Sequence, residues 1–566
     1  MRARVFRPLS PLMAGAILLT ALPCAPLIGQ EAASPALQAS PIQIAAIDSL
    51  FQDVDGTRIP GCAVGVSQDH AIILERAYGL ADLEHGVINT PWTIFEPGSV
   101  SKQFTATATI LLALDGEISL DDDIRDYFPE LPDYGATITI RHLLNHTSGL
   151  RDWGSVAGIE GWPRTTRVHT HAHVLDIASR QMSLNYPPGD YYSYTNTGYN
   201  LQAILVERVS GMSFAEFSRK RIFEPLGMTR TQWRDDFTRI VEDRAIAYRG
   251  SRDGSFSMVM PFENVHGNGG LLTTVGDLLR FTHNLDTGEL WGPRYLEEMH
   301  RQGVLKSGHT ISYASGLRVG EYKGLREVQH SGRTAAYQGF LTRFPGEGVA
   351  VAVMCNTTRA SSGGLARSVA EIFLGDAVVE AGTPPTPTTI DVAPEDLAAL
   401  AGGYRIIDGT RKGTLFYVRP GSDRLLAAGT ELFPVAQNRF QSARGTVLQF
   451  DADPMADGRP AVTLNPESEP VRMAPVPAFE PDEAALAEYV GAFRSDEAEA
   501  TLTFVVEDGE LLIRDRWGDT GRLVPIYPDA FQAGGTTWIF HRDASGAISE
   551  ATLSESRVWD LRFKKM

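Results

Sequence analysis

Short runs of apolar residues lie near both ends of the first two thirds of the chain. GCAVGVS and AIILERAYG, within residues 61–79, and YQGFLTRFP and GVAVAVMCN, within residues 337–356, have the composition of strands. A long region of helical pattern separates them, and GGLARSVAEIFLG at 363–375 predicts a last helix. Strands at both ends with helices between them predict an α+β domain, over residues 45–377, whose sheet is closed by the returning C-terminal strands.

The hydrophobic pattern changes after residue 377. Residues 378–393 are rich in Pro and Thr, with little to bury, and predict an interdomain linker. From Glu395 onward, short alternating apolar runs are separated by turn pairs such as DG, GS and SG. This pattern is typical of antiparallel β structure.

The β region contains an internal repeat. LAALAGGYR at 397–405 matches LAEYVGAFR at 486–494, an offset of 89 residues, and two further matches, NRFQ with DAFQ and LQFDAD with WIFHRD, have offsets of 91 and 90 residues. The repeat predicts two small antiparallel β-barrels, at 394–476 and 482–566, because barrel closure removes exposed strand edges. We expect them to shape access to an active site without supplying its chemistry.

The N-terminus has the layout of a secretory signal peptide. Three arginines precede an apolar run from Leu12 to Leu22, followed by small or turn-forming residues, and we expect cleavage after about residue 29. Later apolar runs are too short to cross a bilayer, so we expect an exported protein with no stable membrane span. Two cysteines then remain, Cys62 and Cys355, both in apolar strand-like runs; we expect buried free thiols, although an exported chain could also join them in a disulfide.

Composition narrows the classes of function. The 566 residues are 43% hydrophobic, enough for several buried cores, and the formal net charge is −18 without a basic run after the first few residues. The basic surface needed for phosphate backbones is missing, so nucleic acid is excluded as an expected partner. The expected partner is a small-molecule or short-peptide substrate, no cofactor is implied, and the sequence does not fix the oligomeric state.

The segment FEPGSVSKQFTA at 95–106 contains the first candidate chemistry. If Pro97 and Gly98 form the turn into a helix, Ser99 lies at its N-terminus and Lys102 lies one turn further on the same face. Ser99 is then the candidate nucleophile, Lys102 is a neighbour able to take its proton, and Ser101 points elsewhere.

Two further segments offer polar groups to one cavity. In PPGDYYSYTNTGYN at 187–200, Tyr194 and Asn196 are two residues apart and project to one side. In REVQHSGRTAAYQGF at 326–340, His330 and Gly332 share one face of a strand end, and the backbone N–H of Arg333 could donate to an oxyanion. Taken separately, the two segments could equally be a solvated turn and a histidine in a turn.

In this order, the three motifs Ser-x-x-Lys, Tyr-x-Asn and His-x-Gly resemble the penicillin-recognising serine hydrolases: class C β-lactamases, DD-peptidases, D-aminopeptidases and related esterases. The resemblance extends to ITIRHLLNHTSGL at 138–150 and covers about residues 45–375. It implies a β-lactamase/transpeptidase-like fold. The duplicated β region resembles the pair of lipocalin-like barrels of the D-aminopeptidase branch.

The resemblance implies an acyl-enzyme route. Ser99 would attack a carbonyl, Lys102 and Tyr194 would move protons, and Asn196 would hold the substrate amide. The N–H groups of Ser99 and Arg333 would form the oxyanion hole. Either proton carrier would need its pKa lowered by about 3 units to act as a base near pH 7, and the sequence leaves the choice between them open.

His330 departs from the Lys-Thr-Gly that many β-lactamases of this family carry. A histidine with an ordinary pKa is mostly neutral at pH 7, so it anchors a substrate carboxylate less firmly than a lysine does. Turnover of carboxylate-bearing substrates is expected to rise as pH falls and the histidine takes up a proton. This makes a β-lactamase less expected and a peptidase or an esterase more so. The leading hypothesis is hydrolysis of amide bonds in small peptides, with D-aminopeptidase or DD-peptidase character. An esterase or a β-lactamase is the alternative within the class, and a catalytically silent binding protein is the alternative outside it.

Two other histidine segments invite different interpretations. HTHAH, with His169, His171 and His173, could ligate a metal, but VLDIASRQM after it predicts a helix and no carboxylate set accompanies it. We interpret HTHAH as an exposed helix start and expect no metal site. His146 in NHTSG is interpreted as part of a turn, although it could be taken for a catalytic base beside Ser148.

Overall fold

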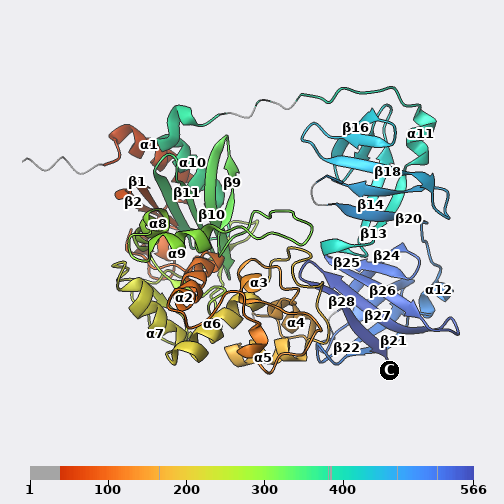
Figure 1. The fold of residues 1–566 in the computed structure, drawn as a ribbon, viewed down its shortest axis with the longest axis horizontal. Helices are drawn as coiled ribbons and strands as arrows, with labels where there is room; N and C mark the ends of the chain where they lie inside the picture. Colours follow the sequence, from red (N-terminus) through yellow and green to blue (C-terminus); the bar gives the residue numbers. More distant parts are fainter. Residues whose placement is uncertain (1–37, 165, 380–381, 383–384, 468–469, 519) are drawn as a thin grey trace, which may run out of the picture. The chain divides into compact units, whose positions relative to one another are not determined.

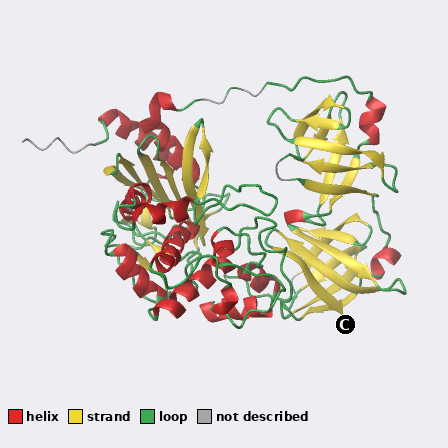
Figure 2. Cartoon of the chain, viewed as in Figure 1, coloured by secondary structure: helices red, strands yellow, loops and turns green. Residues whose placement is uncertain are grey.

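The computed structural model describes residues 38–566 except 165, 380–381, 383–384, 468–469 and 519. The predicted signal peptide and part of the predicted linker lie outside the described residues. Residues 38–566 form one compact unit by their internal contacts. In this unit an α+β domain is followed by two antiparallel β-barrels, as Figures 1 and 2 show, which confirms the predicted fold class.

The sheet of the α+β domain has six strands in the order β2-β1-β12-β11-β10-β9, all antiparallel to their neighbours. Strand β1 from the start of the domain pairs with β12 from its end, as the sequence pattern predicts. The strands are β1 (Cys62–Gln68), β2 (Ala71–Tyr78), β9 (Arg318–Tyr322), β10 (Leu325–Thr334), β11 (Tyr337–Phe344) and β12 (Val349–Cys355).

Strand β12 shows how the sheet packs on both faces. All its residues are buried, and alternate side chains join different cores. Val349, Val351 and Val353 pack with helices α1 (Pro41–Phe51) and α10 (Ser362–Leu374), whereas Ala350 and Ala352 pack with the helical region on the opposite face. Burial on both faces explains why β12 is a continuous apolar run without polar alternation.

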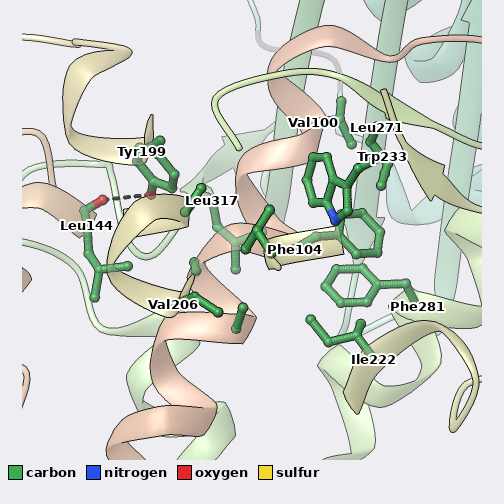
Figure 3. Packing of buried hydrophobic residues seen from close by; sticks show 14 of the residues in the cluster. Val100, Phe104, Leu144, Tyr199, Val206, Ile222, Trp233, Leu271, Phe281 and Leu317 are labelled. Atoms are coloured by element: carbon green, nitrogen blue, oxygen red, sulfur yellow. Dashed lines mark hydrogen bonds between the residues drawn. The ribbon is translucent and has the colours of Figure 1, made fainter. Parts of the chain in front are cut away.

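The helical region is built around α2 (Lys102–Leu114), in which residues 102–112 are all buried. Phe104 of α2 stacks on Phe281, with 4.1 Å between ring centroids, and Tyr199 donates a hydrogen bond to the backbone oxygen of Leu144 at 2.8 Å (Figure 3). A helix enclosed on all sides holds its first residues rigidly. The other helices of this region are α3 (Ile140–Leu144), α4 (Trp153–Ile159), α5 (His171–Arg180), α6 (Thr197–Ser210), α7 (Phe214–Ser218), α8 (Val275–Thr287) and α9 (Gly292–His300).

Three short two-stranded sheets complete the α+β domain. They pair β3 (Leu80–Asp82) with β4 (Val87–Ile88), β5 (Gln232–Trp233) with β8 (Leu271–Leu272), and β6 (Tyr248–Gly250) with β7 (Phe256–Met258). Throughout the described part of the chain, every helix is too short or too polar to span a bilayer.

Each copy of the repeat forms a closed barrel of eight antiparallel strands, which confirms the predicted pair of barrels (Figure 1). Short helices, α11 (Pro394–Ala399) and α12 (Glu483–Ala487), precede them. The first barrel comprises β13 (Gly402–Ile406), β14 (Leu415–Pro420), β15 (Leu425–Ala427), β16 (Thr430–Ala436), β17 (Arg439–Gln441), β18 (Val447–Pro454), β19 (Pro460–Leu464) and β20 (Val471–Val476). The second comprises β21 (Gly491–Ser495), β22 (Ala500–Glu507), β23 (Glu510–Arg514), β24 (Thr520–Tyr527), β25 (Ala530–Ala533), β26 (Thr536–Arg542), β27 (Ile548–Glu555) and β28 (Val558–Lys565).

The two cysteines form a disulfide, so the expectation of free thiols is wrong. Cys62 and Cys355 are directly opposite in the β1–β12 register, with their Cα atoms 4.0 Å apart and their sulfurs bonded. Burial alone did not distinguish a thiol from a disulfide, because both are small and apolar. The register of two strands 293 residues apart in sequence decides the question.

Candidate active site

The nucleophile candidate lies in a tight turn that is held against the sheet. Ser99 belongs to the 3-10 turn Gly98–Ser101 that leads into α2. Gly98 has φ +56°, and a methyl group built on it would lie 2.5 Å from the backbone N of Arg333. A methyl group on Gly332 would lie 1.9 Å from the backbone O of Pro97 and 2.5 Å from the backbone N of Ser99. Two glycines therefore allow β10 to touch the turn, and they bring the backbones of Ser99 and Arg333 together.

Lys102 is the side chain that contacts Ser99 most directly. Its Nζ lies 3.1 Å from Ser99 Oγ, 2.9 Å from Asn196 Oδ1 and 2.7 Å from the backbone O of Asn268. The side chain is fully buried, and no carboxylate is among these three partners. Burial, followed by repulsion from the guanidinium of Arg557, lowers the pKa of Lys102 well below its usual value.

Tyr194 lies on the other side of the lysine. The Lys102 Nζ is 4.8 Å from the centre of the Tyr194 ring, and the ring packs against His146 at 4.3 Å. Burial raises the pKa of Tyr194, and the nearby Ser99 hydroxyl opposes the rise only in part. Among the described residues, no group meets full hydrogen-bond geometry with the Tyr194 hydroxyl. The phenol therefore holds its proton at neutral pH.

Asn196 precedes helix α6 and is oriented through its backbone. Its N–H donates to Asp152 Oδ2 at 2.6 Å, while Asp152 Oδ1 accepts from the N–H groups of Gly154 and Ser155 at the start of α4. Asp152 thus connects two helix starts, and it directs the Asn196 amide toward Lys102. The sequence motif identified Asn196 but gave no signal for Asp152, which is 44 residues away.

His330 lies in β10 on the same face as Gly332, because both are buried while Ser331 between them is exposed. Its Nε2 is 2.9 Å from the Tyr313 hydroxyl, and its Nδ1 is 2.6 Å from the backbone O of Ser331. Burial and the nearby Lys102 lower the pKa of His330 to about 3. The expectation that this histidine keeps an ordinary pKa is therefore wrong, because burial disfavours the charged ring.

Ser101 and His146 are the remaining candidates near Ser99 and Lys102. Ser101 Oγ donates to the backbone O of Gly98 at 2.5 Å and accepts from the N–H of Leu271, so this hydroxyl points away from Lys102. His146 stands in a turn with φ +59°, and its Nδ1 accepts from the N–H of Thr195 at 3.3 Å. Its ring packs on Tyr194, a contact that the sequence gave no reason to expect.

The segment HTHAH begins helix α5 at His171, as predicted, but it is less exposed than expected. His169 is buried, and its Nε2 contacts the backbone O of Trp162 at 3.1 Å. His171 has ligand atoms within 4.8 Å of those of Glu207 and His266. The Nε2 of His171 contacts the backbone of His266, at 3.0 Å from its O. This group was not recognised from the sequence, because two of its members come from other segments.

Ser99, Tyr194, Asn196, His330 and Gly332 line one cavity of about 640 Å³. Its described lining contains four arginines and no aspartate or glutamate. One of the arginines, Arg557, comes from the turn between β27 and β28 of the second barrel. The lining residues are Gly98, Ser99, Arg164, Tyr194, Asn196, Asn268, Gly269, Arg318, His330, Ser331, Gly332, Arg333, Thr334, Gln338, Phe340, Ser361, Ser362, Gly363 and Arg557.

Comparison with known proteins identifies the family of the chain. The beta-lactamase family model matches residues 47–372, more than half of the chain, and the protein belongs to this family of serine hydrolases. It is 30% identical to penicillin-binding protein 4* of Bacillus subtilis (strain 168) over 295 residues. That match covers 48% of this chain and 63% of the relative, slightly less than two thirds of the relative's length.

Two other proteins match a larger share of the chain. A D-aminopeptidase of Brucella anthropi is 25% identical over 512 residues, which covers 87% of this chain and 93% of the relative. The structure of the octameric penicillin-binding protein homologue from Pyrococcus abyssi has a TM-score of 0.53 at 22% identity. It covers 83% of this chain and 97% of that chain, and it shows the same fold.

Proposed function

We propose that the protein hydrolyses amide bonds of small peptides or amides, with D-aminopeptidase or DD-peptidase character, through an acyl-enzyme on Ser99. The observation that carries the proposal is the buried Lys102 Nζ, 3.1 Å from Ser99 Oγ, with a pKa well below its usual value. A neutral amine at this distance is a competent base for a serine hydroxyl. The similarity to a D-aminopeptidase over most of the chain supports the substrate class.

The opposite pKa shifts of Lys102 and Tyr194 support a different role for each. Ser99 Oγ attacks the carbonyl carbon, and its proton moves to Lys102 Nζ as the Oγ–C bond forms. Tyr194, which retains its proton, donates it to the leaving nitrogen as the C–N bond breaks, and Lys102 returns a proton to the phenol. A water molecule then releases the acyl group by the reverse sequence of proton transfers.

Backbone and amide groups orient the substrate in this mechanism. The N–H groups of Ser99 and Arg333 receive the oxyanion, since Gly98 and Gly332 allow the two backbones to approach. The Asn196 amide, directed by Asp152, binds the substrate amide next to Lys102. Neutral His330 and Gly332 line the same cavity as Asn196, and the missing side chain of Gly332 leaves room for an extended substrate backbone.

The test is covalent labelling with a neutral fluorophosphonate, read by intact-mass spectrometry. Ser99→Ala should abolish labelling, whereas Ser101→Ala, the matched control two residues away, should retain it. Labelling that disappears in Ser101→Ala but persists in Ser99→Ala contradicts the proposal. A panel of D-amino-acid amides, short-chain esters and β-lactams then ranks the peptidase against its esterase and β-lactamase alternatives.

We also propose that the protein is exported and acts in the periplasm or outside the cell. The Cys62–Cys355 disulfide supports this, because disulfides persist in oxidising compartments. Residues 1–37 fused to a reporter enzyme that works only after export should give activity, and the same fusion with Leu18 and Leu19 replaced by arginines should not. Activity that is equal in both fusions contradicts the proposal.

A further inference from the structure

The positive charge around Ser99 is only partly compensated. Arg164 pairs with Glu263 through two hydrogen bonds. Arg318 donates to the Tyr192 hydroxyl at 2.9 Å and lies over the Tyr313 ring, so its partners are neutral. Arg333 has an exposed side chain at the rim. Because no carboxylate is among the described lining residues, these guanidinium groups act on whatever enters the cavity.

Arg557, the fourth arginine of the lining, is held by several hydrogen bonds although it comes from the second barrel. Its backbone O accepts from the N–H of Asp152 at 3.2 Å and from Asn185 Nδ2 at 3.1 Å. Asn185 Oδ1 in turn accepts from the N–H of Trp559 at 2.8 Å, and Arg151 donates to the Trp559 backbone O at 3.0 Å. These bonds hold the β27–β28 turn against the loops that carry Asp152 and Asn185.

The side chain of Arg557 extends from this turn toward the reacting groups. Its guanidinium carbon lies 5.0 Å from the centre of the Tyr194 ring, and its nearest carboxylate is Asp152, 3.7 Å away. Asp152 already accepts three backbone hydrogen bonds, so Arg557 is not its main partner. About a third of the Arg557 side chain remains exposed and faces the cavity.

Building on the function proposed above, we propose that Arg557, together with Arg318 and Arg333, forms a binding subsite for a carboxylate of the substrate. The second barrel thereby supplies a specificity-determining residue, and the preferred substrates are peptides with a free carboxylate, which favours the DD-peptidase over the D-aminopeptidase character of the proposed function. The groups lining the cavity fit an anion. Three guanidinium groups offer charge-assisted hydrogen bonds, whereas a substrate ammonium group would meet like charge. Neutral His330 does not supply that charge.

The pKa of Lys102 gives a second, independent readout of the charge of Arg557. The positive charge of Arg557 adds to burial in lowering the pKa of Lys102, and this keeps the amine neutral. Removing the guanidinium should therefore raise the pKa of Lys102, so the acid limb of the labelling profile should move to higher pH. A residue that only held the barrel in place would not cause this shift in the intact, folded protein.

Binding to the subsite can be measured without turnover. N-acetyl-D-alanyl-D-alanine and its carboxamide differ only in one charge, and each is used to protect Ser99 from the neutral fluorophosphonate. In the full-length protein the carboxylate form should protect at a concentration at least ~10-fold lower than the carboxamide form, as expected for a hydrogen-bonded ion pair. The preference should weaken between 50 mM and 500 mM salt, because exposed charges are screened.

The variants separate this inference from the proposed function. Arg557→Ala should reduce the protection ratio about tenfold, and Arg557→Glu should reverse it, whereas Arg522→Ala, an exposed arginine of β24 in the same barrel, should leave it unchanged. If the Arg557 variants do not fold, Arg333→Ala, which removes an exposed side chain, should likewise reduce the protection ratio. Wild-type protein that cannot be labelled refutes the proposed function. Labelled protein without a carboxylate preference, or with one that survives in Arg557→Glu, refutes the subsite.

Discussion

Gly332→Ala gives a direct test of how the nucleophile is positioned. The added methyl group would lie 1.9 Å from the backbone O of Pro97 and 2.5 Å from the backbone N of Ser99, whereas ordinary contacts begin at 3.4 Å. Both neighbours are backbone atoms, so neither can rotate away. Strand β10 and the Ser99 turn must therefore separate by about 1 Å or more.

The expected effect on rate follows from that displacement. A shift of about 1 Å in a reacting group costs roughly 100-fold in rate, equivalent to about 2.7 kcal/mol of activation free energy. The expected cost in folding stability is about 1–3 kcal/mol, as for other overpacked sites. A domain of ordinary stability tolerates that loss, so the variant should be folded but slow.

The assay compares the second-order rate of fluorophosphonate labelling with urea denaturation of the same samples. Gly320→Ala is the matched control, because it lies in neighbouring strand β9 and a methyl group there meets no atom within 4 Å. The control should label at the wild-type rate. If Gly332→Ala also labels within about threefold of wild type while folded, the contact between β10 and the Ser99 turn does not set the geometry of the nucleophile, and the reasoning fails.

Three further perturbations test other parts of the structure. Burial lowers the pKa of Lys102 well below its value in the unfolded chain, so the unfolded state binds more protons. The free energy of unfolding of the wild type minus that of Lys102→Met should therefore rise with pH, by up to about 1.4 kcal/mol per pH unit where only the unfolded lysine is protonated; a flat difference between pH 7 and 9 means that the buried lysine keeps its charge. Replacing both Cys62 and Cys355 by alanine should lower the free energy of unfolding in urea by about 2–5 kcal/mol, because the disulfide closes a loop of 293 residues, and a loss under 0.5 kcal/mol would contradict this. Arg234→Met should cost about 3–5 kcal/mol by leaving the buried Glu96 carboxylate without its two-bond partner, and adding Glu96→Gln should recover much of the loss; no recovery would mean that packing, rather than charge, dominates.

Local signals in the sequence were sufficient for the fold class because they were strong and mutually consistent. Strands β1, β2, β11 and β12 are short apolar runs, and the offset of about 90 residues identified two equivalent β units. The Cys62–Cys355 disulfide was missed for the opposite reason. It depends on the register between strands from opposite ends of the domain, and composition carries no information about register.

In the candidate site, too, some residues have a local sequence signal and others depend on the fold. Ser99, Lys102, Tyr194, Asn196 and His330 occur in short motifs. The structure places four of them in the lining of one cavity, and the fifth, Lys102, is buried behind it in contact with Ser99 and Asn196. Residues that support them from a distance carry no motif. The carboxylate of Asp152 accepts a hydrogen bond from the backbone N–H of Asn196. Asn268 contacts Lys102 through its backbone carbonyl oxygen, which any residue would provide. The low pKa of His330 likewise follows from burial beside Lys102, which appears only after folding.

The groups that would react and most of the groups that would select the substrate stand on different elements of this chain. The atoms that would react stand on the most constrained elements: Ser99 in a turn clamped by β10, and Lys102 at the start of a buried helix. The arginines that would select the substrate stand at edges, with Arg318 at the start of the edge strand β9 and Arg557 in a barrel turn. A substitution at Arg557 leaves the elements that carry Ser99 and Lys102 unaltered in sequence; it changes the charge that an incoming substrate meets and, through the loss of that charge, raises the pKa of Lys102. On this reasoning a new substrate preference requires few changes in the α+β domain, and the second barrel is the element in which to seek it.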